Sequence, residues 1–225
     1  MLRVIRFYAT CSLAPFALAL GADIFLVVER VLGFGCGLAA GLSFSGLALL
    51  FWYGLEVLKA RHEGGEERRV TDQESSGGTP LEKKIEQMLT ETRVVLPGAQ
   101  ALLGFQLIIA FTDAFENLSA FAKGVHLAAL GFVALTVIWL MAPAAFHRIV
   151  YAGEDTVEFH KLGSRFLLAA SIALAFGIAG DLGVVVGKVA GSSVAGVAAA
   201  VLSLALLIGL WHLYPLWKRR SIAKA

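Results

Sequence analysis

The chain has 225 residues, of which 58% are hydrophobic and only 16% are charged. Soluble domains are about 45–50% apolar and about 25% charged, and a soluble fold of this length could not hide so much apolar surface from water. The formal net charge of +2 is too small to indicate a nucleic-acid partner. The composition therefore predicts an integral membrane protein whose main partner is the lipid bilayer.

Apolar segments long enough to cross a bilayer recur along the whole chain. A spanning helix needs about 20 mostly apolar residues. In chain order the candidates are Phe7–Val28, Val31–Leu58, Leu96–Phe115, Val125–Phe146, Phe166–Val186 and Val194–Tyr214. We therefore predict an all-α fold, a polytopic transmembrane bundle of six spans.

Lysine and arginine are distributed unequally between the two sides of these spans. If the N-terminus is cytoplasmic, all but three of the 19 basic residues lie inside, and only Arg30, Lys123 and Lys188 lie outside. Cytoplasmic loops carry the excess of positive charge in membrane proteins. The pattern predicts that both termini are cytoplasmic.

A composition break divides the chain into three parts. Residues 60–79 contain Gly64-Gly65 and Ser75-Ser76-Gly77-Gly78 among many charges, which is typical of a flexible linker. We predict an N-terminal transmembrane hairpin at 1–59, a cytoplasmic linker at 60–79, and an amphipathic helix plus four-span bundle at 80–225. The basic start of the chain also fits a signal peptide, but its apolar run is long enough to span.

The predicted amphipathic helix directly follows the linker. Its apolar face carries Leu81, Ile85, Met88, Leu89 and Val95. Its charged face carries Glu82, Lys83, Glu86 and Glu91. Such a helix lies on the membrane or against a partner helix. Pro97-Gly98 should then bend the chain into the third span, because proline interrupts the helical hydrogen-bond ladder.

Two short motifs stand at the start of the third span and at the end of the fourth. The first is ETRVVLPGAQ at residues 91–100, and the second is APAAFHR at residues 142–148. Together they resemble a bacterial integral-membrane family, the domain of unknown function family 6328. The resemblance covers about residues 81–186. It implies a topology and a bacterial inner-membrane location, but no activity and no site residues.

Small residues at four-residue spacing form two stripes. The second span carries Gly33, Gly37, Gly41 and Ser45, and the fifth carries Ala175, Ala179, Gly183 and Gly187. Small side chains let helices approach closely in lipid. The stripes therefore predict either packing within the chain, which we favour, or the seam of a homo-oligomer.

Ionisable residues inside or beside a span are costly and so are candidate sites. Asp23 lies in the outer third of the first span, and Asp113 and Asp181 lie at the outer ends of the third and fifth. Gln106 is seven residues before Asp113, so a continuous helix would place both on one face. These four residues are our candidate ion or proton site. The alternative is that the carboxylates only mark the membrane interface.

Other polar residues predict no catalytic, metal or cofactor site. His126 and His212 lie near span ends on opposite sides of the membrane, which favours interfacial positions and excludes one shared haem. Neither the cysteine spacing nor any short motif indicates metal, nucleophile or phosphate chemistry. We therefore expect a non-enzymatic scaffold or an assembly or stress-related bundle. The alternative is a channel or carrier for protons or small cations that uses the outer carboxylates.

Overall fold

The computed structural model describes residues 12–54, 80–149 and 155–222. The predicted linker at 60–79 and the first residues of the chain lie outside these ranges. Throughout the described residues the secondary structure is helical, joined by short turns, which confirms the all-α prediction.

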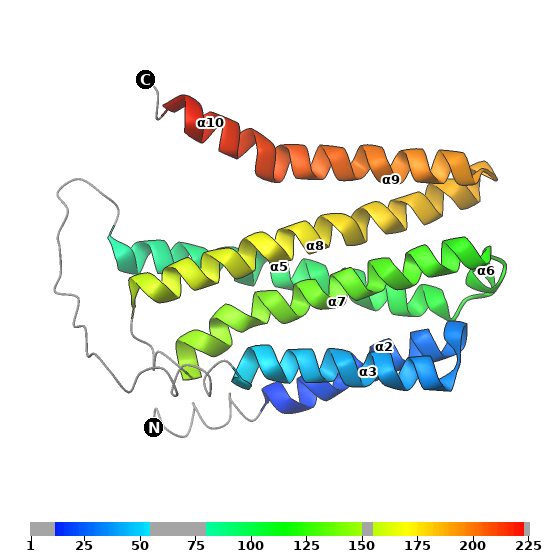
Figure 1. Ribbon diagram of the computed structural model, residues 1–225, viewed down its shortest axis with the longest axis horizontal. Helices are drawn as coiled ribbons and strands as arrows, with labels where there is room; N and C mark the ends of the chain where they lie inside the picture. The colour runs from blue at the N-terminus through cyan, green and yellow to red at the C-terminus, as the bar shows by residue number, and fades with distance from the viewer. Residues whose placement is uncertain (1–11, 55–79, 150–154, 223–225) are drawn as a thin grey trace.

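Long helices lie side by side along one axis (Figure 1). The α-helices are α2 (Leu13–Leu32), α3 (Phe34–Leu49), α5 (Leu81–Ala110), α6 (Asp113–Glu116), α7 (Ala120–Ile149), α8 (Val157–Ala190), α9 (Ser193–Ile208) and α10 (Tyr214–Ile222). Two π-helical segments, η1 (Leu50–Gly54) and η2 (Gly209–Leu213), continue α3 and α9. We call the end of the bundle formed by Gly33, residues 111–119 and residues 191–192 the turn end. The opposite end, where α2 begins and α10 ends, is the terminal end.

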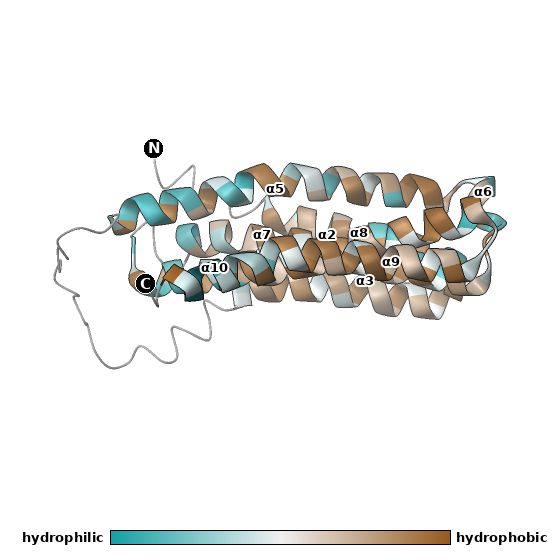
Figure 2. Cartoon of the chain, turned by 90° about the horizontal axis from the view of Figure 1, so that it is seen from above, coloured by the Kyte–Doolittle hydropathy of each residue, from teal (hydrophilic) through white to brown (hydrophobic). Residues whose placement is uncertain are grey.

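Five helical segments of the described chain are long and apolar enough to cross a membrane. They are Phe34–Gly54, Leu81–Ala110, Ala120–Arg148, Val157–Ala190 and Ser193–Ile222. The helix α2 is not among them and carries Asp23, Glu29 and Arg30 along its 20 residues. Hydrophobic residues cover the middle of the bundle, while hydrophilic residues gather on the N-terminal part of α5 and on α10 (Figure 2).

The helix α5 differs from the prediction of two elements joined by a bend. It runs without interruption from Leu81 to Ala110 with Pro97 inside it. A proline is tolerated within a packed helix because neighbouring groups compensate for the missing hydrogen bond. Ile85 and Met88 of its N-terminal half are buried, and Met88 lies against Gly163 of α8. The segment predicted as a separate amphipathic helix is therefore the first half of the same helix that contains the predicted third span.

The hairpin of α2 and α3 packs against α7, the helix with the most fully buried surface. Trp52 of η1 is 2% exposed, stacks on Phe16 of α2, and donates its indole N–H to the carbonyl oxygen of Ile138 at 3.0 Å. A buried indole N–H needs such a partner. Trp52 therefore fixes the hairpin to the rest of the bundle.

Small residues bring α2 and α3 into backbone contact. A Cβ added to Gly41 would lie 2.7 Å from the carbonyl oxygen of Gly21, and one added to Gly37 would lie 2.8 Å from Cβ of Glu29. Ser45 donates its hydroxyl to the carbonyl oxygen of Ala17 at 3.1 Å. The stripe of α3 thus meets α2 of the same chain, without room for larger side chains.

We expect Gly41→Leu to destabilise the protein by about 1–3 kcal/mol or more, because the new side chain must push α2 and α3 apart. Gly46→Leu is the matched control, since an added Cβ at Gly46 meets nothing within 4 Å. The measurement is detergent-induced unfolding of the purified protein followed by circular dichroism. Equal stability of the two variants would show that the close approach of α2 and α3 contributes nothing.

Candidate functional site

Three polar side chains from three different helices meet inside the half of the bundle nearest the turn end. They are Gln106 of α5, His126 of α7 and Asp181 of α8. Gln106 is 1% exposed and His126 is 2% exposed. The Asp181 side chain retains 21% of its accessible surface. We call these three residues the polar cluster.

Each member of the polar cluster contacts the other two. The Gln106 side-chain amide donates from Nε2 to Oδ2 of Asp181 at 2.6 Å. His126 Nε2 lies 3.1 Å from the backbone carbonyl oxygen of Gln106. The other ring nitrogen, Nδ1, lies 3.3 Å from Oδ1 of Asp181 but without the alignment of a hydrogen bond.

Two buried oxygen atoms of the polar cluster lack a hydrogen bond. Among the described residues these are the Oε1 atom of Gln106 and the Oδ1 atom of Asp181. A buried acceptor without a partner costs about 1–3 kcal/mol, and more when it is charged. The polar cluster can therefore accept a proton or a further hydrogen bond at these two oxygen atoms.

Glycines on α8 let the helices of the polar cluster approach one another. A Cβ added to Gly177 would lie 2.5 Å from a methyl carbon of Val133, and one added to Gly180 would lie 3.0 Å from Cβ of Ala129. Both glycines lie within four residues of Asp181. The close contact of α7 with α8 brings the carboxyl group within reach of the His126 ring.

Below the polar cluster, toward the terminal end, the interior is mostly apolar. The buried side chains that follow His126 on α7 include Ala129, Leu130, Val133 and Val137, each at most 2% exposed, and Thr136, whose hydroxyl donates to backbone carbonyl oxygens. Large buried side chains at interior packing density leave little room for water. This apolar layer separates the polar cluster from the terminal end.

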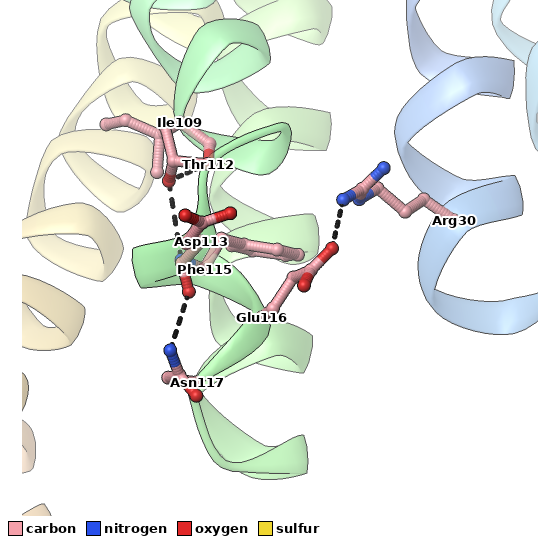
Figure 3. Close-up of polar contacts among 7 residues, drawn as sticks. All are labelled: Arg30, Ile109, Thr112, Asp113, Phe115, Glu116 and Asn117. Atoms are coloured by element: carbon pink, nitrogen blue, oxygen red, sulfur yellow. Dashed lines mark hydrogen bonds and ion pairs between the residues drawn. The ribbon is translucent and has the colours of Figure 1, made fainter.

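Above the polar cluster, the short helix α6 places Phe115 on the His126 ring. Phe115 is 2% exposed, and its ring centroid lies 5.3 Å from that of His126 in an edge-on arrangement. Lys123 Nζ lies 5.8 Å from the centroid of the same Phe115 ring. Thr112 caps α6 by accepting a hydrogen bond from the Phe115 amide at 3.3 Å (Figure 3). Phe115 therefore closes the polar cluster from the turn end.

Polar contacts tie the α6 region to its neighbours. Arg30 at the end of α2 forms an ion pair with Glu116, as Figure 3 shows, and its guanidinium lies 5.3 Å from the Phe111 ring centroid. Lys188 of α8 donates to the carbonyl oxygen of Asn117 at 3.1 Å. Exposed ion pairs contribute about 0–1 kcal/mol each, so these contacts position α6 more than they stabilise it.

A cavity of about 500 Å³ lies next to the polar cluster, between the connection to α7, the end of α8 and the start of α9. Its lining includes Val125, which precedes His126, and Val184, which is one helical turn from Asp181. Lys188 and Ser192 line it at the turn end. The cavity brings space at the turn end to within one turn of the carboxyl group.

The sequence matches the model of a protein family over most of its helices. Residues 75–215, which are more than half of the chain, match the Family of unknown function (DUF6328). The chain belongs to the DUF6328 family. This confirms the resemblance seen in the sequence motifs and extends it through α9 and η2. A search of curated proteins and a search of solved structures each found no match.

The part of this DUF6328 protein that matches the family contains the whole polar cluster. It begins before α5 and ends just after η2, so the hairpin of α2 and α3 lies outside it. Arg30 and Trp52 therefore connect a segment outside the matched region to α6 and α7.

The candidate site residues of this DUF6328 protein do not all meet. Gln106 and Asp181 lie in the polar cluster, whereas Asp113 is exposed on α6 and Asp23 is half-buried on α2. Because α5 ends at Ala110, Gln106 and Asp113 are not on one helix as expected. Asp113 contributes its backbone carbonyl, which accepts a hydrogen bond from Asn117 at 2.9 Å.

The glycine stripes lie at different places. Gly33 is in the turn between α2 and α3 with φ of 86°, a conformation that favours glycine, and no atom lies within 4 Å of an added Cβ. Gly37 and Gly41 face α2, while Gly183 and Gly187 face Gly196 of α9. The homo-oligomer that these stripes offered as the alternative to packing within the chain stays a prediction.

His126 is the member of the polar cluster that the sequence analysis left as an interfacial residue. A signal for it was present, because Gln106, His126 and Asp181 all lie in the half of their predicted antiparallel spans that is nearest the turns. Depth alone does not show which face of each helix points inward. Only the packing of α5, α7 and α8 brings the three side chains together.

Proposed function

We propose that this chain is a six-span membrane carrier for protons or another small cation, with the polar cluster as its binding site. The observation that carries the proposal is the contact of Gln106, His126 and Asp181 inside the bundle, where two buried oxygen atoms lack a hydrogen bond. Polar and ionisable groups inside membrane spans are expensive and typically mark ion pathways.

The sixth span in this proposal is α2. It has 20 residues, enough to cross the hydrocarbon core, and it runs back along α3. Two of its charged residues, Glu29 and Arg30, lie in its last turn at the turn end. That leaves only the half-buried Asp23 at membrane depth.

We place the turn end on the outer face and the terminal end in the cytoplasm of a bacterial inner membrane. Arg30, Lys123 and Lys188 are the basic residues on the turn-end side, and the positive-inside rule assigns the basic-poor side to the exterior. The polar cluster would then lie in the outer half of the membrane, with the cavity beside α8 facing outward.

A carrier fits the interior better than an open channel does. The apolar layer formed by Leu130, Val133 and Val137 lies between the polar cluster and the cytoplasmic side. Passage through it requires the helices to rearrange, as in alternating access. A continuous water-filled pore would require these side chains to move apart.

The test is ion flux into liposomes that contain the purified full-length protein. An internal pH dye follows proton entry under an imposed pH gradient, and a Na⁺-sensitive dye follows sodium under a sodium gradient. We expect flux in the wild type and only the leak of protein-free liposomes with Asp181→Asn, since that change removes the carboxylate. Asp113→Asn, at an exposed carboxylate of the same end, should retain flux.

No flux under gradients of either sign would overturn the carrier proposal. Equal flux in Asp181→Asn and the wild type would overturn the assignment of the polar cluster as the binding site. If the protein shows no flux, a scaffold or assembly role remains the expected function.

A further inference from the structure

We infer that the polar cluster binds a single proton, shared between Asp181 and His126, in preference to a metal cation. This inference rests on the proposed function because it names the cation that the binding site takes. It depends on the orientation of the His126 ring and on which of its nitrogens carries hydrogen.

The backbone of α5 determines the tautomer of His126. The Nε2 atom lies 3.1 Å from the carbonyl oxygen of Gln106, and a carbonyl oxygen can only accept a hydrogen bond. Nε2 must therefore carry the hydrogen and donate it. In a neutral ring, Nδ1 then has no hydrogen and presents a lone pair.

Nδ1 lies beside the carboxyl group of Asp181. Nδ1 lies 3.3 Å from Oδ1, while the other carboxyl oxygen, Oδ2, already accepts the amide hydrogen of Gln106. A neutral ring beside an ionised carboxylate would place two lone pairs against each other in a buried site. One added proton removes this repulsion, either as a carboxylic acid that donates to Nδ1 or as an imidazolium that donates to Oδ1.

The balance of the step is simple. With the proton bound, the pair is either two neutral groups or one anion beside one cation, and its net charge is zero. When the proton leaves, a carboxylate and a neutral ring remain, with a net charge of −1. No other bond is made or broken. The Oδ1 atom, which has no hydrogen bond in the structure, is the acceptor for the proton.

Few other charges influence the pair. Within four residues of the polar cluster on α5, α7 and α8, the only other charged residue is Lys123, and its Nζ lies over the Phe115 ring. The other charged groups on the elements around the turn end are Asp23, Glu29, Arg30, Asp113, Glu116 and Lys188. Arg30 and Glu116 are paired with each other, so neither neutralises Asp181.

The donor set suits a proton better than a metal ion. A hard cation such as Ca²⁺ takes about six to eight oxygen ligands. The polar cluster offers two uncommitted oxygens, and the described residues hold no group of three acidic, histidine or cysteine side chains that could hold a metal. A proton needs only the two facing atoms.

Nitrogen NMR of ¹⁵N-histidine-labelled full-length protein in micelles tests the inference directly. The His126 signals are assigned by their loss in His126→Gln, and the other four histidines serve as internal references. We expect Nε2 to carry hydrogen, and the shift of Nδ1 to show the proton shared with Asp181. In Asp181→Asn no carboxylate lies beside Nδ1, so the signal of the shared proton should be lost.

Sodium added at constant pH should leave the His126 signals unchanged. A wild-type ring with hydrogen on Nδ1 and none on Nε2 would overturn the inference, without any need for a variant. So would a sodium-dependent shift, or an unchanged Nδ1 signal in Asp181→Asn, with Asp113→Asn as the control for loss of a nearby carboxylate. Proton binding to the polar cluster without flux in liposomes would support this inference and contradict the proposed carrier function. Sodium flux without proton binding would support the carrier function and contradict this inference.

Discussion

His126→Leu is expected to lower the free energy of unfolding by about 3 kcal/mol, because it removes the ring nitrogen that lies 3.3 Å from Asp181 Oδ1 and leaves this buried oxygen facing apolar atoms. Leucine is close to histidine in size, so little of the effect comes from an empty space.

A second change separates this effect from general damage. Asp181→Asn added to His126→Leu should restore most of the lost stability, because the asparagine amide is uncharged and leaves no unpaired charge inside the bundle. His160→Leu, at a half-buried histidine in α8 near the terminal end, is the matched control and should cost much less. The measurement is SDS-induced unfolding in mixed micelles. Additive losses in the double variant would mean that His126 and Asp181 do not interact.

Phe115→Ala is expected to cost about 3–5 kcal/mol and to open the polar cluster to the turn end. The Phe115 ring is 2% exposed and covers the His126 ring, so its removal leaves a cavity directly above the polar cluster. Water and small reagents should then reach Asp181 more quickly than in the wild type.

Carbodiimide labelling of Asp181, read by mass spectrometry, measures this opening. Carbodiimides react with carboxyl groups, so faster labelling in Phe115→Ala reports access to the Asp181 side chain. Phe34→Ala is the control, because Phe34 lies at the same end but is 63% exposed. Similar labelling rates in both variants and in the wild type would show that Phe115 does not limit access.

Particular residues show why the sequence analysis predicted the architecture better than the site. Length and hydropathy alone predict an all-helical membrane protein, since a lipid environment allows few other ways to satisfy the backbone. The motifs around Pro97 and Pro143 were enough to indicate the family. Pro97 nevertheless lies inside the continuous helix α5. A helix that packs against others tolerates a proline, and the sequence of one segment does not show which helices pack against it.

Gln106 and Asp181 were candidates because polar residues in apolar runs are conspicuous wherever they occur. Asp113 was grouped with them on the assumption that α5 continued, but α5 ends at Ala110 and the chain turns through α6. His126 was passed over because a histidine near a span end is ordinary. Its role depends on a carbonyl of α5 and a carboxyl of α8, which are 20 and 55 residues away along the chain.

The sequence by itself therefore determined that this protein is helical, is suited to a membrane and belongs to its family, because these properties follow from local composition and short motifs. Only the tertiary structure decided which polar residues meet. The packing of α5, α7 and α8, with α7 and α8 in close approach at Gly177 and Gly180, brings Gln106, His126 and Asp181 together. The same holds for the stripes of small residues. Their spacing places the glycines on one side of a helix, but the helix that packs there determines what each glycine contacts.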